Sequence, residues 1–141
     1  MLETVPPPQI QTHTILIIDD EAKALDTWAI RLQECSNNYT VLKANSIIAA
    51  LDLCRHRKVH CVVLDLELND ESGFEVLFAL VPDRQHREIA VVVLTHLSSA
   101  NLHEMAVEYG AHACLVKRNT TPQFLHRAIQ AAIASVQGQA N

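Results

Sequence analysis

The chain has 141 residues, of which 49% are hydrophobic and 19% are charged, and its formal net charge is −5. This length suits one domain with a sizeable core, and the composition is typical of a globular protein rather than a disordered one. The acidic balance, without a basic stripe, argues against direct nucleic-acid binding. No apolar stretch approaches the ~20 residues needed to cross a membrane, and the first residues lack the pattern of a secretory signal, so we expect a cytoplasmic protein.

The two ends of the chain differ from the rest. Residues 1–12 include Pro6, Pro7 and Pro8 and lack apolar periodicity, so we expect a disordered leader. We expect one domain over residues 13–137 and a frayed tail over residues 138–141. The proline-bearing leader is compatible both with a single-domain protein and with a piece of a larger chain.

Segments typical of strands and helices alternate five times between these ends. Short apolar runs predict the strands, and apolar residues at helical spacing predict the helices. The predicted strands are residues 14–18, 39–43, 60–64, 89–94 and 112–116. The predicted helices are residues 21–35, 46–57, 73–81, 99–109 and 122–136, and residues 67–72 are predicted to form a polar loop.

The central predicted strands are apolar at nearly every position, which indicates a sheet that is buried on both faces. With helices between successive strands, this pattern predicts a doubly wound α/β domain with a parallel sheet. Ligands of such sheets bind beyond the carboxyl ends of the strands.

Four of the apolar runs end on residues with distinct chemistry. Asp19 and Asp20 follow the first run, Asp65 the third, Thr95 the fourth and Lys117 the fifth. Three carboxylates at one edge are costly without a counter-charge, and Mg²⁺ prefers carboxylate oxygens while it bridges to phosphate. A carboxylate such as Asp65 can act as a nucleophile toward phosphorus, with the hydroxyl and the ammonium as contacts for the phosphoryl oxygens.

With these residues, the chain resembles the receiver (CheY-like) domain of two-component response regulators. Gly73, eight positions after Asp65, and Gly110 followed by Ala111 also match the family pattern, and the resemblance covers about residues 13–136. It implies a flavodoxin-like sheet of five parallel strands in the order 2-1-3-4-5, flanked by five helices. It further implies that Asp65 accepts a phosphoryl group from a phosphohistidine of a sensor histidine kinase or a histidine phosphotransfer protein.

The resemblance also implies a set of ligands for Mg²⁺. Asp20 and Asp65 would bind the ion directly, Asp19 would act through water, and the backbone carbonyl of Glu67 would complete the set. Thr95 and Lys117 would contact the phosphoryl group.

Two positions near Lys117 depart from the family pattern. Cys114 stands where the family has a tyrosine or phenylalanine that reports the movement of the threonine, and a cysteine is too small to report it in the same way. Arg118 stands where the family has a proline, often after a cis peptide bond. Since a cis bond before a non-proline residue costs about 3–4 kcal/mol, we expect a trans bond between residues 117 and 118.

Two further unusual residues follow Thr95. His96 stands where the family prefers a small residue; it is either a surface histidine or a gate beside the phosphate. Leu97 and Glu67 occupy the two variable positions that flank the family's site. We expect the apolar Leu97 to hinder the attacking water and to make the aspartyl phosphate comparatively long-lived.

Two other readings of the chain remain open. A receiver-like module that binds partners without phosphorylation would keep the fold but lose the chemistry. A haloacid dehalogenase-like phosphatase would need an aspartate where Glu67 stands and acidic metal ligands after Lys117, yet residues 118–141 contain no Asp or Glu. We therefore expect no enzyme activity on other substrates.

The last predicted helix and the cysteines bear on dimerisation and on metal binding. The helix is broadly apolar. A wide face buried in the core explains this, and a homodimer surface on the helix is the alternative. Its apolar residues are Phe124, Leu125, Ala128, Ile129, Ala132, Ile133 and Val136. The four cysteines lack metal-ligand spacing and are interpreted as structural.

Overall fold

The computed structural model describes residues 11–69, 71–81 and 88–138. Most of the predicted leader and most of the predicted tail lie outside these residues. Among the described residues, no helix is both long enough and apolar enough to cross a membrane.

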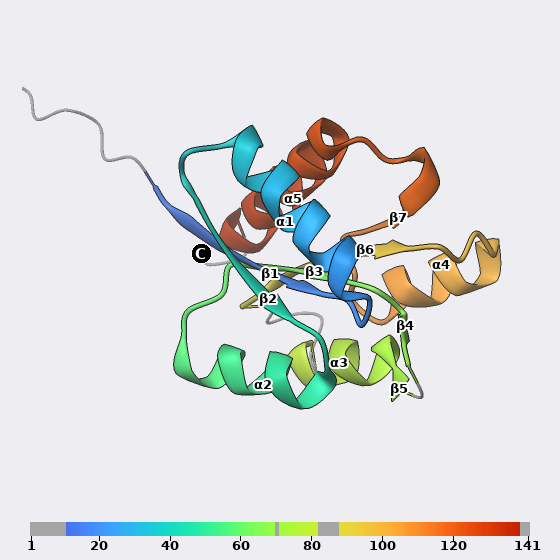
Figure 1. The fold of residues 1–141 in the computed structure, drawn as a ribbon. Coiled ribbons are helices and arrows are strands. Elements are labelled where there is room, and N and C mark those ends of the chain that lie inside the picture. The colour runs from blue at the N-terminus through green and yellow to red at the C-terminus, as the bar shows by residue number, and fades with distance from the viewer. Residues whose placement is uncertain (1–10, 70, 82–87, 139–141) are drawn as a thin grey trace, which may run out of the picture.

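The core of the fold is a parallel sheet of five strands in the order β2-β1-β3-β6-β7 (Figure 1). Every neighbouring pair in it runs parallel. In chain order the strands are β1 (His13–Ile18), β2 (Tyr39–Ala44), β3 (Cys61–Leu64), β6 (Ala90–Thr95) and β7 (Ala113–Val116). The order equals 2-1-3-4-5 when only these strands are numbered, so the predicted topology is confirmed.

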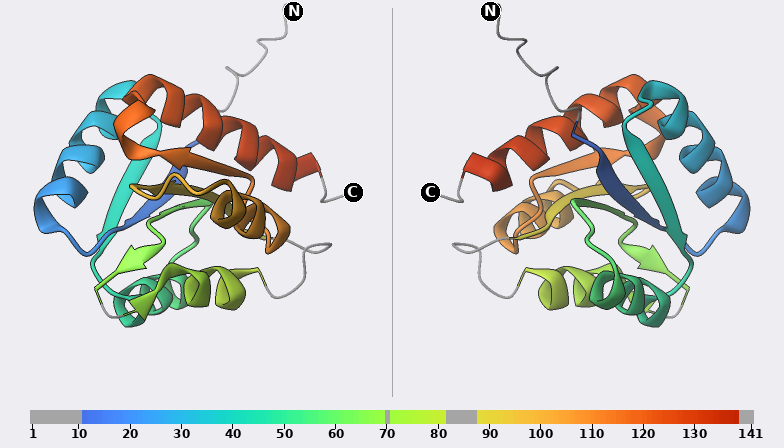
Figure 2. Two further views of the ribbon diagram at one scale, coloured as in Figure 1. Left: turned by 90° about the vertical axis from the view of Figure 1, so that its right-hand side faces the viewer. Right: turned by 90° about the vertical axis from the view of Figure 1, so that its left-hand side faces the viewer.

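Within residues 11–69, 71–81 and 88–138, five α-helices cover the two faces of this sheet. They are α1 (Ala22–Cys35), α2 (Ile47–His56), α3 (Gly73–Leu80), α4 (Ala100–Glu108) and α5 (Pro122–Gly138). Helices α1 and α5 pack on one face, and α2 and α3 pack on the other (Figures 1 and 2). The buried Ala106 of α4 belongs to the same core as α2 and α3.

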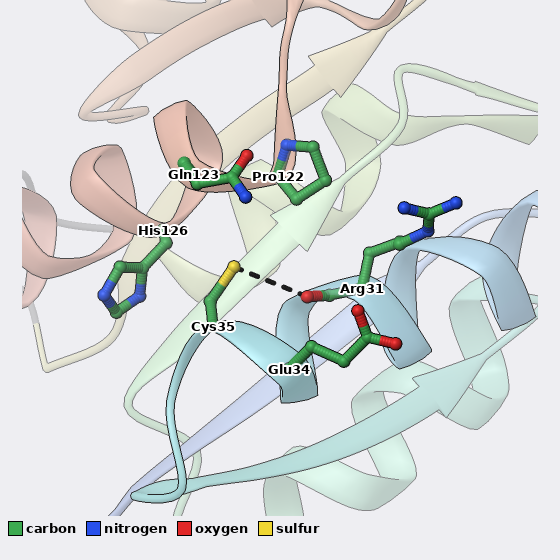
Figure 3. A pocket seen from close by; sticks show the side chains of 6 residues that line it. All are labelled: Arg31, Glu34, Cys35, Pro122, Gln123 and His126. Atoms are coloured by element: carbon green, nitrogen blue, oxygen red, sulfur yellow. Dashed lines mark hydrogen bonds between the residues drawn. The ribbon is translucent and has the colours of Figure 1, made fainter.

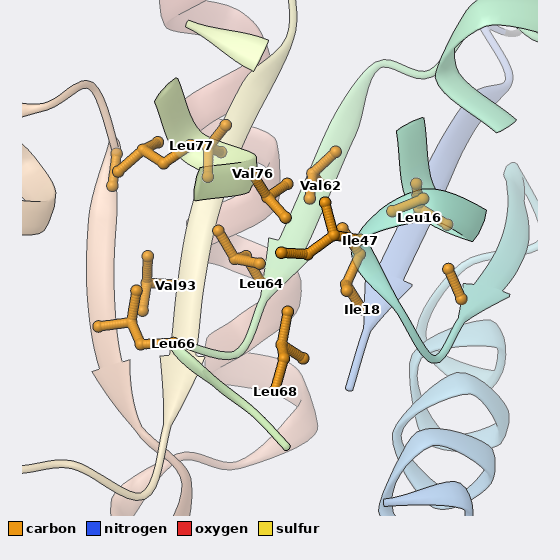
Figure 4. Close-up of a cluster of buried hydrophobic side chains, with 14 of the residues drawn as sticks. Leu16, Ile18, Ile47, Val62, Leu64, Leu66, Leu68, Val76, Leu77 and Val93 are labelled. Atoms are coloured by element: carbon orange, nitrogen blue, oxygen red, sulfur yellow. The ribbon is translucent and has the colours of Figure 1, made fainter. Parts of the chain in front are cut away.

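Successive residues of the central strands supply two separate cores, because side chains alternate between the faces of a sheet. In β1, Ile15 and Ile17 pack under α1 and α5, whereas Leu16 and Ile18 pack toward α2 and α3 (Figure 4). Fully burying one such side chain contributes about 1.5–3 kcal/mol. The continuous apolar runs of the sequence are therefore explained by burial on both sides.

Residues at the helix ends satisfy local hydrogen-bonding and backbone requirements. Ser46 accepts a hydrogen bond from the amide of Ala49 at the start of α2. Thr121 accepts one from the amide of Phe124 in the first turn of α5. Gly110, which follows the C-terminal end of α4, has φ of +119°, a backbone conformation that residues other than glycine rarely adopt.

The prediction of a plain polar loop after β3 is wrong. Residues Glu67–Leu68 (β4) and Glu71–Ser72 (β5) form a short antiparallel pair. Leu68 is only 1% exposed and anchors this pair in the core. Two-residue strands are too short to show the alternation by which a sequence predicts a strand. A 3₁₀ turn, Lys117–Asn119, was also not predicted, and α5 extends to Gly138 rather than ending near Val136.

Candidate phosphorylation site

The structure brings the predicted polar residues together at the carboxyl ends of β1, β3, β6 and β7. Asp19, Asp65, Thr95 and Lys117 are 3%, 5%, 0% and 8% exposed, and no other charged residue in the described part of the chain is so buried. Burying charged groups is expensive unless they are paired, so this edge is a specialised site rather than an ordinary surface.

Lys117 is the centre of the site. Its ammonium donates hydrogen bonds to Asp19 Oδ2 at 2.5 Å and to Asp65 Oδ2 at 2.8 Å. Burial by itself would lower the pKa of Lys117, but the hydrogen bonds and negative charges of the two aspartates outweigh it and raise that pKa above its usual value. The lysine is therefore held as a cation between two buried carboxylates.

The remaining oxygens of these two aspartates are held by the backbone turns that follow their strands. Asp19 Oδ1 accepts a hydrogen bond from the amide of Glu21 at 3.0 Å. Asp65 Oδ1 accepts one from the amide of Glu67 at 3.0 Å. Each carboxylate thus uses one oxygen to fix its own turn and the other to bind Lys117, which sets its orientation.

Asp20 is oriented differently from the other two aspartates. Its Oδ2 accepts a hydrogen bond from the amide of Asn69, at the tip of the β4–β5 pair, at 2.5 Å. Asn69 has φ of +50°, a conformation that asparagine tolerates better than most residues. In the described part of the chain, no three side chains of His, Cys, Asp or Glu are arranged to hold a metal ion. The structure therefore gathers Asp19 and Asp65 around Lys117 and leaves Asp20 turned toward the hairpin.

Thr95 lies at the end of β6 and is fully buried. Its hydroxyl oxygen accepts a long hydrogen bond, 3.3 Å, from the amide of Leu97. None of the described residues accepts a hydrogen bond from this hydroxyl, so its hydrogen is free to bind an added acceptor. Leu97 is partly buried against the core on the α2 and α3 side.

His103 is a residue of this region that the sequence did not reveal. Its Nε2 lies 2.8 Å from the carbonyl oxygen of Leu97 and joins α4 to the loop after Thr95. Eight histidines are scattered through the chain without a motif, so spacing gave no reason to single this one out. Only the path of the loop brings the two residues together.

The unusual neighbours of the site differ in how they are placed. His96 and Arg118 are exposed, and among the described residues no peptide bond is cis, as expected for residue 118. Cys114 is partly buried, and burial raises the pKa of its thiol to about 11. All four cysteines are free thiols.

Gly73 has a steric reason to be glycine. A Cβ atom at this position would lie 2.3 Å from the carbonyl oxygen of Asp65 and 2.7 Å from the Cα of Leu66. The amide of Gly73 also donates a hydrogen bond to the carbonyl of Leu66 at 2.9 Å. The first residue of α3 is thus in direct contact with the backbone that positions Asp65.

A separate pocket of about 260 Å³ lies between the last turn of α1 and the first turns of α5 (Figure 3). The residues that line it include Cys35 and His126, and none of them belongs to the acidic site. His126 instead bonds to the hydroxyl of Tyr39 at 2.7 Å. This pocket has no role in the chemistry described above.

Comparison with known proteins agrees with this geometry. The family model of the response regulator receiver domain matches residues 15–130. The polar-differentiation response regulator DivK of Brucella ovis is 25% identical over 114 residues, which cover 81% of this chain and 91% of DivK. This relative is therefore matched over nearly its whole length.

Solved structures show the same fold. A response regulator receiver domain protein from Clostridium thermocellum has a TM-score of 0.75 at 28% identity and covers 89% of this chain and 97% of its own. A response regulator from Burkholderia pseudomallei was solved with a phosphorylated aspartic acid, a calcium ion and citrate. It has a TM-score of 0.72 at 27% identity, and the match covers 90% of this chain and 72% of that one. With its sheet order, its buried acidic edge and the family match, the chain belongs to the response regulator receiver domain family of two-component signalling.

Proposed function

We propose that Asp65 accepts a phosphoryl group from a phosphohistidine of a sensor histidine kinase or a histidine phosphotransfer protein. The observation that carries the proposal is the buried arrangement in which the Lys117 ammonium binds the carboxylates of Asp19 and Asp65 together. A permanent cation beside a buried carboxylate suits a site where further negative charge develops. Reaction with a cytoplasmic kinase would place the protein in the cytoplasm.

In the proposed reaction, a carboxylate oxygen of Asp65 forms a bond to phosphorus as the bond from phosphorus to the imidazole nitrogen of the donor breaks. The imidazole leaves with the electron pair of that bond, and the product is an acyl phosphate. Lys117 neutralises charge on the transferred phosphoryl oxygens. The unused hydroxyl hydrogen of Thr95 binds another of these oxygens.

The donor set at this edge suits Mg²⁺, because it consists of carboxylate oxygens and a nearby backbone carbonyl. In the proposal, Asp20, Asp65 and the carbonyl of Glu67 bind the ion directly, and Asp19 acts through water. Asp20 would exchange its present hydrogen bond to the amide of Asn69 for this role. The bound ion would supply positive charge that offsets the carboxylates and the phosphoryl group.

The lifetime of the acyl phosphate depends on access of water to phosphorus. In the proposal, the apolar Leu97, packed against the core beside Thr95, offers no group that would orient the water. Slow autodephosphorylation follows from this. The chain then acts only on its own aspartate, as a signalling module rather than as an enzyme that turns over a substrate.

The experiment is incubation of the whole chain with phosphoramidate and Mg²⁺, followed by intact-mass measurement. We expect a gain of one phosphoryl group in the wild type and none in Asp65→Asn. Asp52→Asn is the matched control, because the Asp52 carboxylate is exposed on α2 and lies 3.4 Å from His56, which is not a residue of the acidic site; it should gain the group like the wild type. If the wild type gains nothing from this or any other donor, the chain is instead a receiver-like interaction module, whose homodimerisation would be tested by light scattering.

A further inference from the structure

A short chain of hydrogen bonds leads from the site into helix α4. The amide of Leu97 donates to the Thr95 hydroxyl at 3.3 Å, and His103 Nε2 binds the carbonyl of the same Leu97 at 2.8 Å. The backbone of Leu97 is thus held at its amide by Thr95 of the site and at its carbonyl by His103 of α4. A change at Thr95 reaches α4 through one residue.

Phosphorylation would alter the first of these bonds. The Thr95 hydroxyl is completely buried, and no described residue accepts its hydrogen. A phosphoryl oxygen is a charged acceptor, and charge-assisted hydrogen bonds are roughly twice as strong as neutral ones. The long bond from Leu97 is the weaker of the two contacts of this hydroxyl, so it is the one that yields when the hydroxyl turns toward the phosphate.

Strand β7 has no aromatic ring that could respond to a change at Thr95. Cys114 on β7 is small, and it cannot move in and out of the core as a large ring does. Aromatic side chains gather elsewhere, between α3 and the end of α4. Tyr109, directly after α4, lies with its ring centroid 4.9 Å from that of Phe78 and 6.3 Å from that of Phe74. Phe78 is 48% exposed and Tyr109 is 41% exposed.

Helix α4 connects His103 to Tyr109 through a single helical segment. Ala106 of this helix is fully buried, and Gly110 just after Tyr109 sits tightly against Val81 at the end of α3. Because packed helices shift as units, a displacement of α4 at His103 would also change the contact of Tyr109 with the rings of α3.

Resting on the proposed function, we propose that His103 is the positioning residue that transmits phosphorylation of Asp65 to the α3–α4 aromatic cluster of Phe74, Phe78 and Tyr109. The route runs from Thr95 through the backbone of Leu97 to His103. The aromatic cluster then changes its exposed face in response to the phosphate.

The chain offers a direct probe, because it has only two tyrosines. Replacing both with 3-fluorotyrosine gives two ¹⁹F NMR signals, one from Tyr109 in the cluster and one from Tyr39. Tyr39 is an internal reference, because it is held by His126 on the face covered by α1 and α5. Spectra are recorded at pH 7 before and after phosphorylation by phosphoramidate and Mg²⁺, and intact mass reports the extent of phosphorylation.

Three variants test the route. His103→Leu removes the donor and keeps apolar bulk, and His103→Ala replaces it if circular dichroism shows that the leucine variant is not folded. His103→Gln keeps a side-chain donor and should act as a rescue. His56→Leu is the matched control, because His56 is an exposed histidine on α2.

We expect the Tyr109 signal to shift on phosphorylation in the wild type, in His103→Gln and in His56→Leu. The shift should be lost in His103→Leu, although its mass shows the same phosphorylation. A phosphorylated wild type with an unchanged Tyr109 signal, or an equal shift in His103→Leu, overturns the inference and leaves the proposed function intact. A wild type that gains no phosphoryl group overturns the proposed function itself and this inference with it.

Discussion

Replacing Gly73 with alanine is expected to destabilise the domain at the point where α3 meets the phosphoacceptor. The new Cβ would stand 2.3 Å from the carbonyl oxygen of Asp65 and 2.7 Å from the Cα of Leu66. Both atoms belong to the backbone, so no side-chain rotation relieves the contact. The end of β3 and the start of α3 must move apart.

The size of the effect can be worked from these contacts. Overpacking of a tight site costs about 1–3 kcal/mol. Separating the two segments also weakens the hydrogen bond from the Gly73 amide to Leu66, worth about 0.5–1.5 kcal/mol. Alanine has a higher helix propensity than glycine, and this difference offsets the loss of stability by up to about 1 kcal/mol. We expect a net loss of about 2 kcal/mol in the free energy of unfolding.

Urea denaturation of the purified chain measures this loss. With slopes of about 1–3 kcal/mol per molar urea, the midpoint should fall by about 1 M. Gly138→Ala is the control, because a Cβ atom at Gly138 meets nothing within 4 Å; it should leave the midpoint unchanged or raise it slightly. Phosphorylation of Asp65 should also slow in Gly73→Ala, since the backbone of Asp65 is displaced. Equal midpoints for the two alanine variants would refute the steric argument.

Three further predictions concern charge, pH and the lifetime of the phosphate. Without divalent cations, Lys117→Met leaves the buried carboxylates of Asp19 and Asp65 unpaired. The free energy of unfolding measured in urea should therefore fall by about 3–5 kcal/mol. An unchanged urea midpoint would contradict the ion-pair account. His60 Nδ1 accepts a hydrogen bond from the amide of Thr14, and burial, with nearby positive charge, lowers the pKa of His60. The folded state therefore binds fewer protons than the unfolded state near this pKa. The free energy of unfolding should then fall as pH falls below about 6.5. Urea midpoints between pH 8 and pH 5 should fall more steeply in the wild type than in His60→Gln, and parallel curves would count against this. Leu97→Glu should shorten the lifetime of the aspartyl phosphate, measured by loss of the added mass, whereas equal rates would remove Leu97 from the account.

Much of the fold follows from patterns that are local in the chain. Strands that are apolar at every position, such as β3, need a sheet that is buried on both faces, and the structure confirms this in its two cores. Helix ends are also set locally, because Ser46 caps the first turn of α2 and Gly110 adopts a positive φ just after α4. The β4–β5 pair was missed, since its stability comes from the burial of Leu68 and not from a period in the sequence.

The candidate site was predictable in its members but not in its contacts. Because parallel strands all end at one edge, the positions of Asp65 and Lys117 along the chain were enough to place them together. The same reasoning expected the three aspartates to share one cluster. In the structure, Asp20 turns to Asn69, and Lys117 takes the place between Asp19 and Asp65.

The sequence by itself determined the class of the fold, the order of its elements and the edge at which the reactive residues lie. These properties depend on periodicity and on strand ends, both of which are written locally in the chain. Only the tertiary structure decided that Lys117 reaches Asp19 across 98 residues, and that His103 binds the carbonyl of Leu97. Such pairings depend on the paths of loops and on the rotamers available in a packed interior, which residue spacing does not encode.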